Sequence, residues 1–162
     1  MSKLKYTTIS VIITSYKDNH YLKDLLKDLS NQTYLKNKFE ILILEAGEKK
    51  ELNSLKLKNS KLNNVKYIFK KNLPRTNSLN ELVKASKSEL IVRLDARCKI
   101  NKFYLEKIAR LSQETGAANV GGIRTPISKN EKQKIIGDVM THPLCFGANS
   151  KRYPNKRSYV DS

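Results

Sequence analysis

Three apolar runs of this sequence each end in residues that carry binding chemistry. Thr14 to Tyr16 follow the first run, Glu45 to Gly47 the second and Asp95 to Arg97 the third. If the runs are parallel strands, their carboxyl ends meet at one edge of a sheet, where open α/β proteins bind ligands. A tyrosine there offers a stacking face for a base, and carboxylates accept hydrogen bonds or hold a metal-bound diphosphate. This combination predicts a nucleotide-diphosphate site.

Asp95 is the central candidate because it follows Leu90 to Leu94, a largely apolar run with β-branched members. Such a run is typical of a buried parallel strand. A carboxylate at its end can hold a divalent cation, and the cation can hold a diphosphate. Taken alone, the stretch favours an aspartate that caps the next helix or turns the loop. The two other strand ends favour the binding role.

Several common kinds of site are excluded. The sequence has neither the glycine pattern of a dinucleotide-binding Rossmann turn nor that of a P-loop. Cys98 and Cys145 are the only cysteines and lie far apart, which argues against a disulfide framework or a zinc site. His20 and His142 are the only histidines, and neither is near Cys98 in the sequence. We interpret Cys98 as a plain thiol.

Length and composition suit one folded domain. The chain has 162 residues, of which 39% are hydrophobic and 29% charged, enough for one real core. No apolar run is long enough to span a bilayer, and Met1 to Tyr6 lack the apolar core of a signal peptide. We expect a single domain over residues 1–162, irregular from about residue 123, and a cytoplasmic location.

The formal net charge of +17, from 32 Lys and Arg against 15 Asp and Glu, indicates attraction to polyanions. The lysines are spread over nearly every polar stretch, however, as in a solvated surface. Residues 151–157 are the exception, a basic cluster that is either a solvated loop or a contact with lipid phosphates at the inner face of a membrane. We expect no nucleic-acid partner because no RNA-binding signature or recognition helix is visible.

Apolar runs alternate with helical patterns along the chain, which predicts a doubly wound, mostly parallel sheet flanked by helices. We expect strands at 9–14, 39–44, 65–69, 90–94 and 117–122, and helices at about 22–29, 48–61, 103–115 and 131–140. Ser78 and Glu81 form a capping-box pattern that predicts a further helix starting after a loop at 73–77. Asp18 and Asn19 are candidate N-caps of the first helix.

Seven segments of the sequence resemble the family 2 glycosyltransferases of the GT-A fold. They occur in the family's order and cover roughly the first hundred residues: Val11 to Tyr16, Leu25 to Ser30, Gln32 to Tyr34, Phe39 to Glu45, Ser78 to Asn80, Ala85 to Glu89 and Arg93 to Arg97. The Asp95-Ala96 form, the Gly121-Gly122 pair and residues 159–162 are most similar to the succinoglycan-type exopolysaccharide branch.

The resemblance implies transfer of a sugar from a UDP-sugar, with Mg²⁺ or Mn²⁺, to a saccharide or lipid-linked acceptor. By position, Thr14 and Tyr16 would line the base pocket. Glu45 would replace the aspartate that contacts uridine, and Arg75 would approach the diphosphate. Asp95 would hold the metal, which neutralises charge on the leaving UDP.

Two positions depart from the family pattern. Glu45 is one methylene longer than the family's aspartate, so it either reaches the same atoms or marks weakened donor binding. Arg97 stands where the Asp-x-Asp motif has its second acidic residue. Since a cation cannot ligate a cation, metal binding would rest on Asp95 and the diphosphate, or Arg97 would itself counter the phosphate charge.

The acceptor half of the family, with its general-base aspartate, is expected beyond Ser162, so the catalytic base is unknown. Asp138 and Asp161 are the late aspartates, and neither stands in a matching motif. We therefore expect a truncated GT-A domain, the donor-binding half of an enzyme. The alternative is a non-catalytic nucleotide-sugar-binding or scaffold module of the same fold.

Overall fold

The computed structural model describes residues 7–58, 63–122, 126–128 and 130–142. The chain divides into two compact units, Met1–Ala118 and Asn119–Ser162, which are described separately. All of the predicted site residues belong to the first unit. The prediction that residues 1–162 form one domain stays a prediction, and the basic cluster at 151–157 lies outside the described residues.

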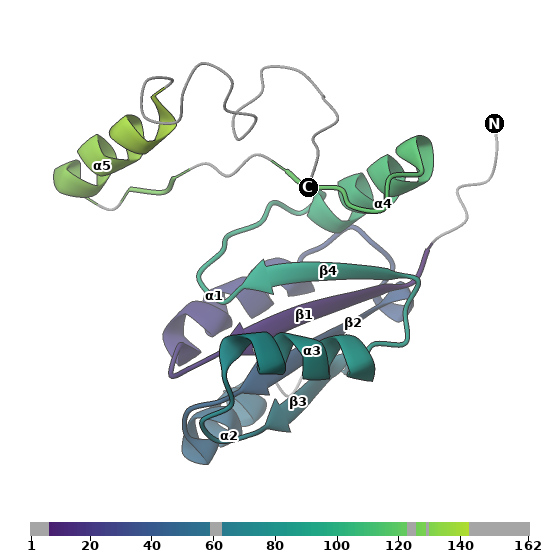
Figure 1. Ribbon diagram of the computed structural model, residues 1–162, viewed down its shortest axis with the longest axis vertical. Coiled ribbons are helices and arrows are strands. Elements are labelled where there is room, and N and C mark those ends of the chain that lie inside the picture. The colour runs from purple at the N-terminus through teal and green to yellow at the C-terminus, as the bar shows by residue number, and fades with distance from the viewer. Residues whose placement is uncertain (1–6, 59–62, 123–125, 129, 143–162) are drawn as a thin grey trace. The chain divides into compact units, whose positions relative to one another are not determined.

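A four-stranded parallel sheet forms the centre of the first unit (Figure 1). Its strands, in the order β3-β2-β1-β4, are β1 (Ile9–Ser15), β2 (Phe39–Glu45), β3 (Val65–Phe69) and β4 (Leu90–Asp95). Four of the five predicted strands are thereby confirmed. The parallel pairing carries all four carboxyl ends to one edge, as the sequence predicted.

Helices cover both faces of the sheet. The elements between and after the strands are α1 (Asn19–Ser30), the short 3₁₀ helix η1 (Lys36–Lys38), α2 (Lys49–Lys58), α3 (Arg75–Ala85) and α4 (Tyr104–Thr115). In Figure 1, α3 lies in front of the sheet, whereas α1 and α2 lie behind it. The chain therefore changes sides when it passes from β3 through α3 to β4. The strand order also reverses there, because β2 and β3 lie on one side of β1 and β4 on the other. In doubly wound folds, ligands bind in the crevice at the carboxyl ends of the two strands where the order reverses, here β1 and β4.

The central strands are buried on both faces because helices cover both. On the α3 face, Ile12, Leu42 and Leu44 pack with Leu82 of α3. Alternate residues of a strand point to opposite faces, so Ile43 belongs to the other face. On that side the leucine stripe of α1 is fully buried: Leu22, Leu25, Leu26 and Leu29. The continuous apolar runs of β1 and β2 reflect this two-sided burial.

The expectation of a buried strand at 90–94 is correct for only one face of β4. Val92 and Leu94 are buried, but Ile91 is 39% exposed and Arg93 is also exposed. The reason is topological, since β4 pairs only with β1 in the described sheet and forms one of its edges. The apolar run Leu90 to Leu94 is interrupted by Arg93, which is the signal in the sequence for this exposed side.

The start of α3 also differs from the prediction. The helix begins at Arg75 with Pro74 at the N-cap, so residues 75–77 are helical and the predicted loop is shorter. Ser78 therefore lies inside the helix, where its hydroxyl donates to the carbonyl of Pro74 at 3.0 Å. Glu81 pairs with Lys70 instead of closing a capping box. The carbonyl of Pro74 accepts from the backbone N–H of Ser78 at 2.9 Å, so the helix begins four residues before the position that the capping box predicts.

The predicted strand at 117–122 is absent from the structure, which shows irregular chain there. Gly116, at φ 61°, ends α4 in the left-handed conformation that glycine favours. The helix predicted at 131–140 is confirmed as α5 (Glu131–Thr141), which belongs to the second unit. Asn130 caps it, because the Asn130 side chain accepts from the backbone N–H of Gln133 at 2.9 Å.

Gln32 joins the end of α1 to the start of α4. Its side-chain amide donates to the carbonyls of Asp28 at 3.1 Å and Asn101 at 2.8 Å. Its carbonyl oxygen accepts from the backbone N–H of Leu105 at 3.1 Å. Only 5% of Gln32 is exposed, so these polar groups have no water to replace a lost partner.

Replacing Gln32 with alanine is expected to lower the free energy of unfolding by about 1–3 kcal/mol, because the N–H of Leu105 and two carbonyls lose a partner in a buried place. Urea denaturation followed by circular dichroism measures the change. A loss below about 0.5 kcal/mol, the usual effect of a surface substitution, would contradict this role.

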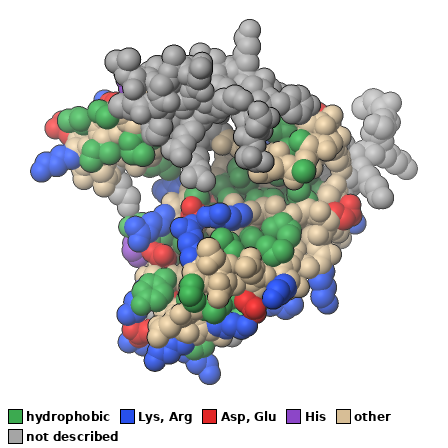
Figure 2. Space-filling view, viewed as in Figure 1, with side chains coloured by type: hydrophobic (Ala, Val, Ile, Leu, Met, Phe, Trp, Pro, Cys, Tyr) green, Lys and Arg blue, Asp and Glu red, His purple; other side chains and the backbone are tan. Residues whose placement is uncertain are grey.

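Basic side chains are spread over the face shown in Figure 2, where Asp and Glu are fewer. This agrees with the lysine-rich sequence and with its net charge of +17. Among the helices of the described residues, none is both long enough and apolar enough to cross a membrane.

Candidate functional site

Strand register brings the three predicted strand ends together. Thr14 of β1 stands opposite Asp95 of β4, and Ser15 stands opposite Glu45 of β2. The end of β1 is thus flanked on each side by a carboxylate-bearing neighbour. The convergence expected from the sequence is therefore present in the fold, at the crevice where the chain changes sides.

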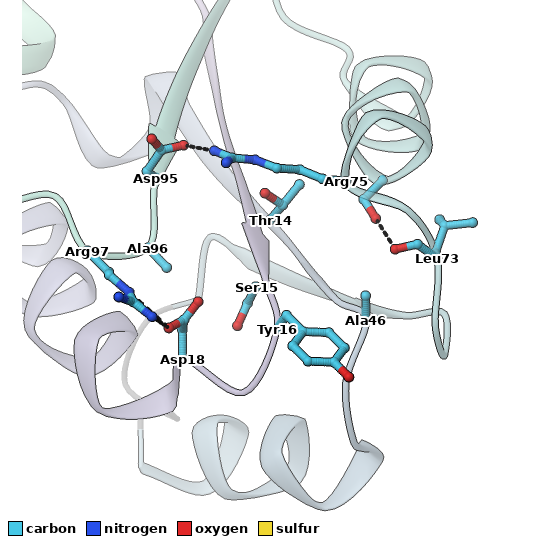
Figure 3. Close-up of a pocket in the computed structure, with 11 residues that line it drawn as sticks. Thr14, Ser15, Tyr16, Asp18, Ala46, Leu73, Arg75, Asp95, Ala96 and Arg97 are labelled. Carbon is cyan, nitrogen blue, oxygen red and sulfur yellow. Dashed lines mark hydrogen bonds and ion pairs between the residues drawn. The ribbon is translucent and has the colours of Figure 1, made fainter.

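A cavity of about 500 Å³ opens at this edge (Figure 3). Its lining comes from the ends of β1, β2 and β4 and from the start of α3: Thr14, Ser15, Tyr16, Asp18, Ala46, Leu73, Arg75, Ser78, Asp95, Ala96 and Arg97. Five of the six predicted binding residues are among them. Tyr16 is 59% exposed, so one large aromatic ring is available to a ligand at the mouth.

Arg75 reaches from the first turn of α3 toward Asp95, as Figure 3 shows, and its guanidinium donates to Oδ1 of that residue. A second guanidinium, from Arg93, stands 3.6 Å from the same oxygen. The side chain of Asp95 caps no helix, because α4 begins only at Tyr104. The carboxylate of Asp95 lines the cavity and is paired with arginine, while its backbone carbonyl accepts from the N–H of Cys98 at 2.9 Å in the turn after β4. The ligand-binding role of Asp95 stays a prediction.

Arg97 makes a second ion pair at the cavity. Its Nε and Nη2 donate to Oδ1 of Asp18 at 3.2 and 3.1 Å. The same guanidinium lies over the ring of Tyr21, 4.8 Å from its centroid, a cation–π arrangement. Asp18 occupies the N-cap position of α1, yet its side chain makes no capping hydrogen bond. The predicted N-cap position of Asp18 is therefore confirmed, but its carboxylate pairs with Arg97 instead of capping the helix.

Glu45 lies apart from the cavity lining. It is fully buried, and its Oε1 accepts from the backbone N–H of Gly47 at 2.7 Å and of Lys17 at 3.1 Å. Lys17 has φ 59°, a conformation that a non-glycine residue rarely adopts. The carboxylate thus links the loop after β2 to a strained residue in the loop after β1. The base-contacting role predicted for Glu45 stays a prediction.

Gly47 is needed for this link. A Cβ at position 47 would lie 2.6 Å from Oε1 of Glu45 and 2.9 Å from Cγ of Lys17. Nearby, Glu48 pairs with Lys50 at 2.7 Å and with Lys17 at 3.1 Å. Hydrogen bonds from Lys50 and then from Lys17 hold the pKa of Glu48 below its usual value. The two loops are therefore joined both inside and at the surface.

Sequence reasoning gave no separate role to Ser15, missed the approach of Arg93 to Asp95, and assigned Asp18 to a cap. Ser15 is 4% exposed and lines the cavity, and its hydroxyl has no hydrogen-bond partner among the described residues. The sequence did hold a signal for two of these residues, because Asp18 lies two residues after Tyr16 and Arg93 lies two residues before Asp95.

The carboxylates of the cavity do not fit a divalent-cation site. Within the described ranges, no three His, Cys, Asp or Glu side chains come together in a way that would hold a metal ion. Asp18 and Asp95 are the carboxylates that line the cavity, and each is paired with a guanidinium. A hard cation prefers oxygen ligands that no other cation occupies.

Comparison with curated proteins gives one relative from Methanococcus voltae. It is the dolichyl N-acetyl-alpha-D-glucosaminyl phosphate 3-beta-D-2,3-diacetamido-2,3-dideoxy-beta-D-glucuronosyltransferase, 28% identical over 149 residues. The match covers 87% of this chain and 46% of the relative. The chain thus spans about half the length of the curated protein that it matches.

Solved structures show the same fold. TarS 1-349 of S. aureus superposes with a TM-score of 0.62 at 21% identity, over 76% of this chain and 40% of that one. The same TarS fragment has been solved with UDP and with UDP-GlcNAc. The mannosyltransferase PcManGT from Pyrobaculum calidifontis, solved with GDP-Man and Mn²⁺, gives a TM-score of 0.58 at 14% identity, over 80% of this chain and 38% of that one.

These likenesses establish the GT-A architecture, a mostly parallel sheet flanked by helices, which the sequence predicted. Residues 10–161 match the model of the family described as "Glycosyl transferase family 2". That match includes every residue of the cavity. The chain belongs to glycosyl transferase family 2.

Proposed function

We propose that the cavity binds the nucleotide diphosphate of a UDP-sugar and that the protein transfers the sugar to a saccharide or lipid-linked acceptor. The main observation is that one cavity, at the carboxyl ends of β1 and β4, is lined by the exposed aromatic ring of Tyr16 and by two arginines, Arg75 and Arg97. Family membership and the TarS complexes with UDP and UDP-GlcNAc support this choice of donor.

The cavity offers separate chemistry to each part of a donor. Tyr16 presents an aromatic face on which a uracil ring can stack. Thr14, half-buried at the end of β1, adds a hydroxyl to the same wall. Arg75 and Arg97 stand on α3 and beyond β4, where guanidinium groups can meet the phosphates. We assign the base to the β1 side and the diphosphate to the arginine side.

Replacing Tyr16 with alanine is expected to weaken UDP binding about tenfold, because base–aromatic stacking contributes about 1–3 kcal/mol. Isothermal titration calorimetry of the full chain with UDP measures the change. Tyr16→Phe keeps the ring and is expected to bind within about threefold of the parent.

Phe103→Ala is the matched control, since Phe103 is also a surface aromatic, 42% exposed, but does not line the cavity. Its UDP affinity is expected to equal that of the parent. If Tyr16→Ala and Phe103→Ala bind UDP alike, the ring of Tyr16 is not part of the base pocket. Absence of UDP binding by the folded parent would refute the proposed function.

A second candidate is a module that binds a nucleotide sugar without turning it over. The observation that favours it is the pairing of both cavity carboxylates, Asp18 and Asp95, with arginine, so neither is an unpaired base. Incubation with UDP-GlcNAc and an added saccharide acceptor separates the two candidates, because a transferase passes the sugar to the acceptor hydroxyl, or slowly to water, and releases UDP. Release of UDP favours the transferase, whereas stable binding without release favours the module.

The remaining assignments concern the setting of the reaction. A role in exopolysaccharide biosynthesis, a cytoplasmic location and contact with an anionic membrane surface stay predictions from the sequence. The Mn²⁺ bound with GDP-Man in PcManGT is consistent with the predicted Mg²⁺ or Mn²⁺ cofactor of the family. In this chain the prediction rested on Asp95, whose carboxylate is paired with Arg75 in a cavity whose carboxylates do not fit a divalent cation.

A further inference from the structure

Arginine surrounds the position where the family resemblance places a metal ion. Asp95 accepts from Arg75 and has Arg93 at 3.6 Å, while Arg97 follows two residues later and holds Asp18. Two guanidinium groups, of Arg75 and Arg97, thus line the cavity together with the two carboxylates, and Arg93 approaches Asp95 as a third. Arg75 and Arg97 are 59% and 69% exposed, so both remain open to a ligand from solvent.

A divalent cation would meet unfavourable surroundings there. It would have to displace Arg75 from Asp95 and then lie close to guanidinium groups of the same charge sign. The second carboxylate that could help, Asp18, is bound by both Nε and Nη2 of Arg97. A cation therefore gains at most one protein ligand, Asp95, and its binding breaks the ion pair between Asp95 and Arg75.

A diphosphate meets favourable surroundings at the same place. Guanidinium groups bind phosphate oxygens through paired, charge-assisted hydrogen bonds, and they remain charged at any physiological pH. Carboxylate and phosphate oxygens present similar acceptors, so each arginine can exchange its aspartate for a phosphate without leaving the cavity. The buried hydroxyl of Ser15, which lines the cavity and lacks a partner among the described residues, is one more donor.

We propose that Arg75 and Arg97 bind the diphosphate of the donor directly, in the place that a divalent cation would take. Asp95 and Asp18 act as counter-ions that hold the two guanidinium groups at the cavity before the donor arrives. This inference rests on the proposed function, because it concerns the diphosphate of the same donor. It assigns Arg97, the departure from Asp-x-Asp, a positive role in binding.

The first test is calorimetric titration of the full chain with UDP, once in excess EDTA and once with Mn²⁺. Affinities that agree within about threefold support direct binding by arginine. Tightening by Mn²⁺ beyond that range overturns the inference but leaves the proposed function intact. A folded chain that binds UDP in neither condition refutes the proposed function as well.

The sharper test is Arg97→Asp, which restores a second carboxylate two residues after Asp95. We expect this variant to bind UDP at least about tenfold more weakly than the parent in EDTA and to regain affinity with Mn²⁺. Arg110→Asp is the matched control. It makes the same charge change on α4, where Arg110 pairs with Glu114 and does not line the cavity. Unchanged UDP binding by Arg97→Asp in EDTA would overturn the inference.

A second variant tests the inference independently, in case Arg97→Asp does not fold. Arg75→Ala removes the other guanidinium and frees Asp95, and we expect UDP binding in EDTA to fall about tenfold. Circular dichroism and the thermal midpoint establish that each variant is folded. Parent-like UDP affinity of a folded Arg75→Ala in EDTA would show that arginine does not hold the diphosphate.

Discussion

Replacing Ile43 with alanine is expected to lower the free energy of unfolding by about 2–5 kcal/mol, the usual cost of truncating a large buried aliphatic side chain. Ile43 is fully buried in β2, with Ile13 of β1 and Tyr67 of β3 beside it in the register. The rigid strands on both sides cannot move into the space that the removed atoms leave. The cost therefore includes a cavity as well as lost apolar burial.

Urea denaturation of the full chain, followed by far-ultraviolet circular dichroism, measures this loss. Val83→Ala is the control, because Val83 lies on α3 with 46% of its surface exposed, and its effect is expected within about 0.5 kcal/mol. Equal midpoints for the two variants would contradict the central place of β2 in the core.

Replacing Glu45 with alanine is expected to lower the free energy of unfolding by about 2–4 kcal/mol, because the backbone N–H groups of Lys17 and Gly47 both lose their acceptor. The side chain is fully buried, so water cannot easily take its place. Loss of the link also frees the loop after β1, which carries Tyr16. We therefore expect weaker UDP binding in addition to lower stability.

Conservative and distant variants identify the cause. Glu45→Gln keeps an acceptor for both N–H groups and is expected to lose less than about 1 kcal/mol. Glu89→Ala removes a carboxylate from an exposed position and is expected to change stability by less than about 0.5 kcal/mol. If Glu45→Gln and Glu45→Ala are equally destabilised, the negative charge matters more than the hydrogen bonds, and the proposed link is wrong.

Local patterns in the sequence were sufficient for the sheet and for the edge that carries the cavity. The apolar runs of β1 and β2 predict strands because both faces of a central strand are buried, and the leucine stripe of α1 predicts a helix for the same reason. Asp95 and Tyr16 were predictable as cavity residues because the carboxyl ends of parallel strands meet.

Boundaries and edges were harder because they depend on neighbours distant in sequence. The small residues at 117–122 suit a strand but pair with no other strand in the described chain, so the local pattern was insufficient. The apolar run of β4 predicts a buried strand, but in the structure β4 is an edge strand of the described sheet. Pro74 and Ser78 both mark helix starts, and only the structure shows that Pro74 prevails.

The chemistry of the cavity was decided by tertiary structure. Arg75 meets Asp95 twenty positions away in the sequence, and Arg97 meets Asp18 from a separation of 79. Glu45 ends its strand as the sequence predicts, yet its carboxylate turns inward to Lys17 and Gly47. Strands that alternate with helices pair in parallel, so residue type and spacing already place these charges at one edge of the sheet. Which charges neutralise one another depends on distances that only the packed fold creates.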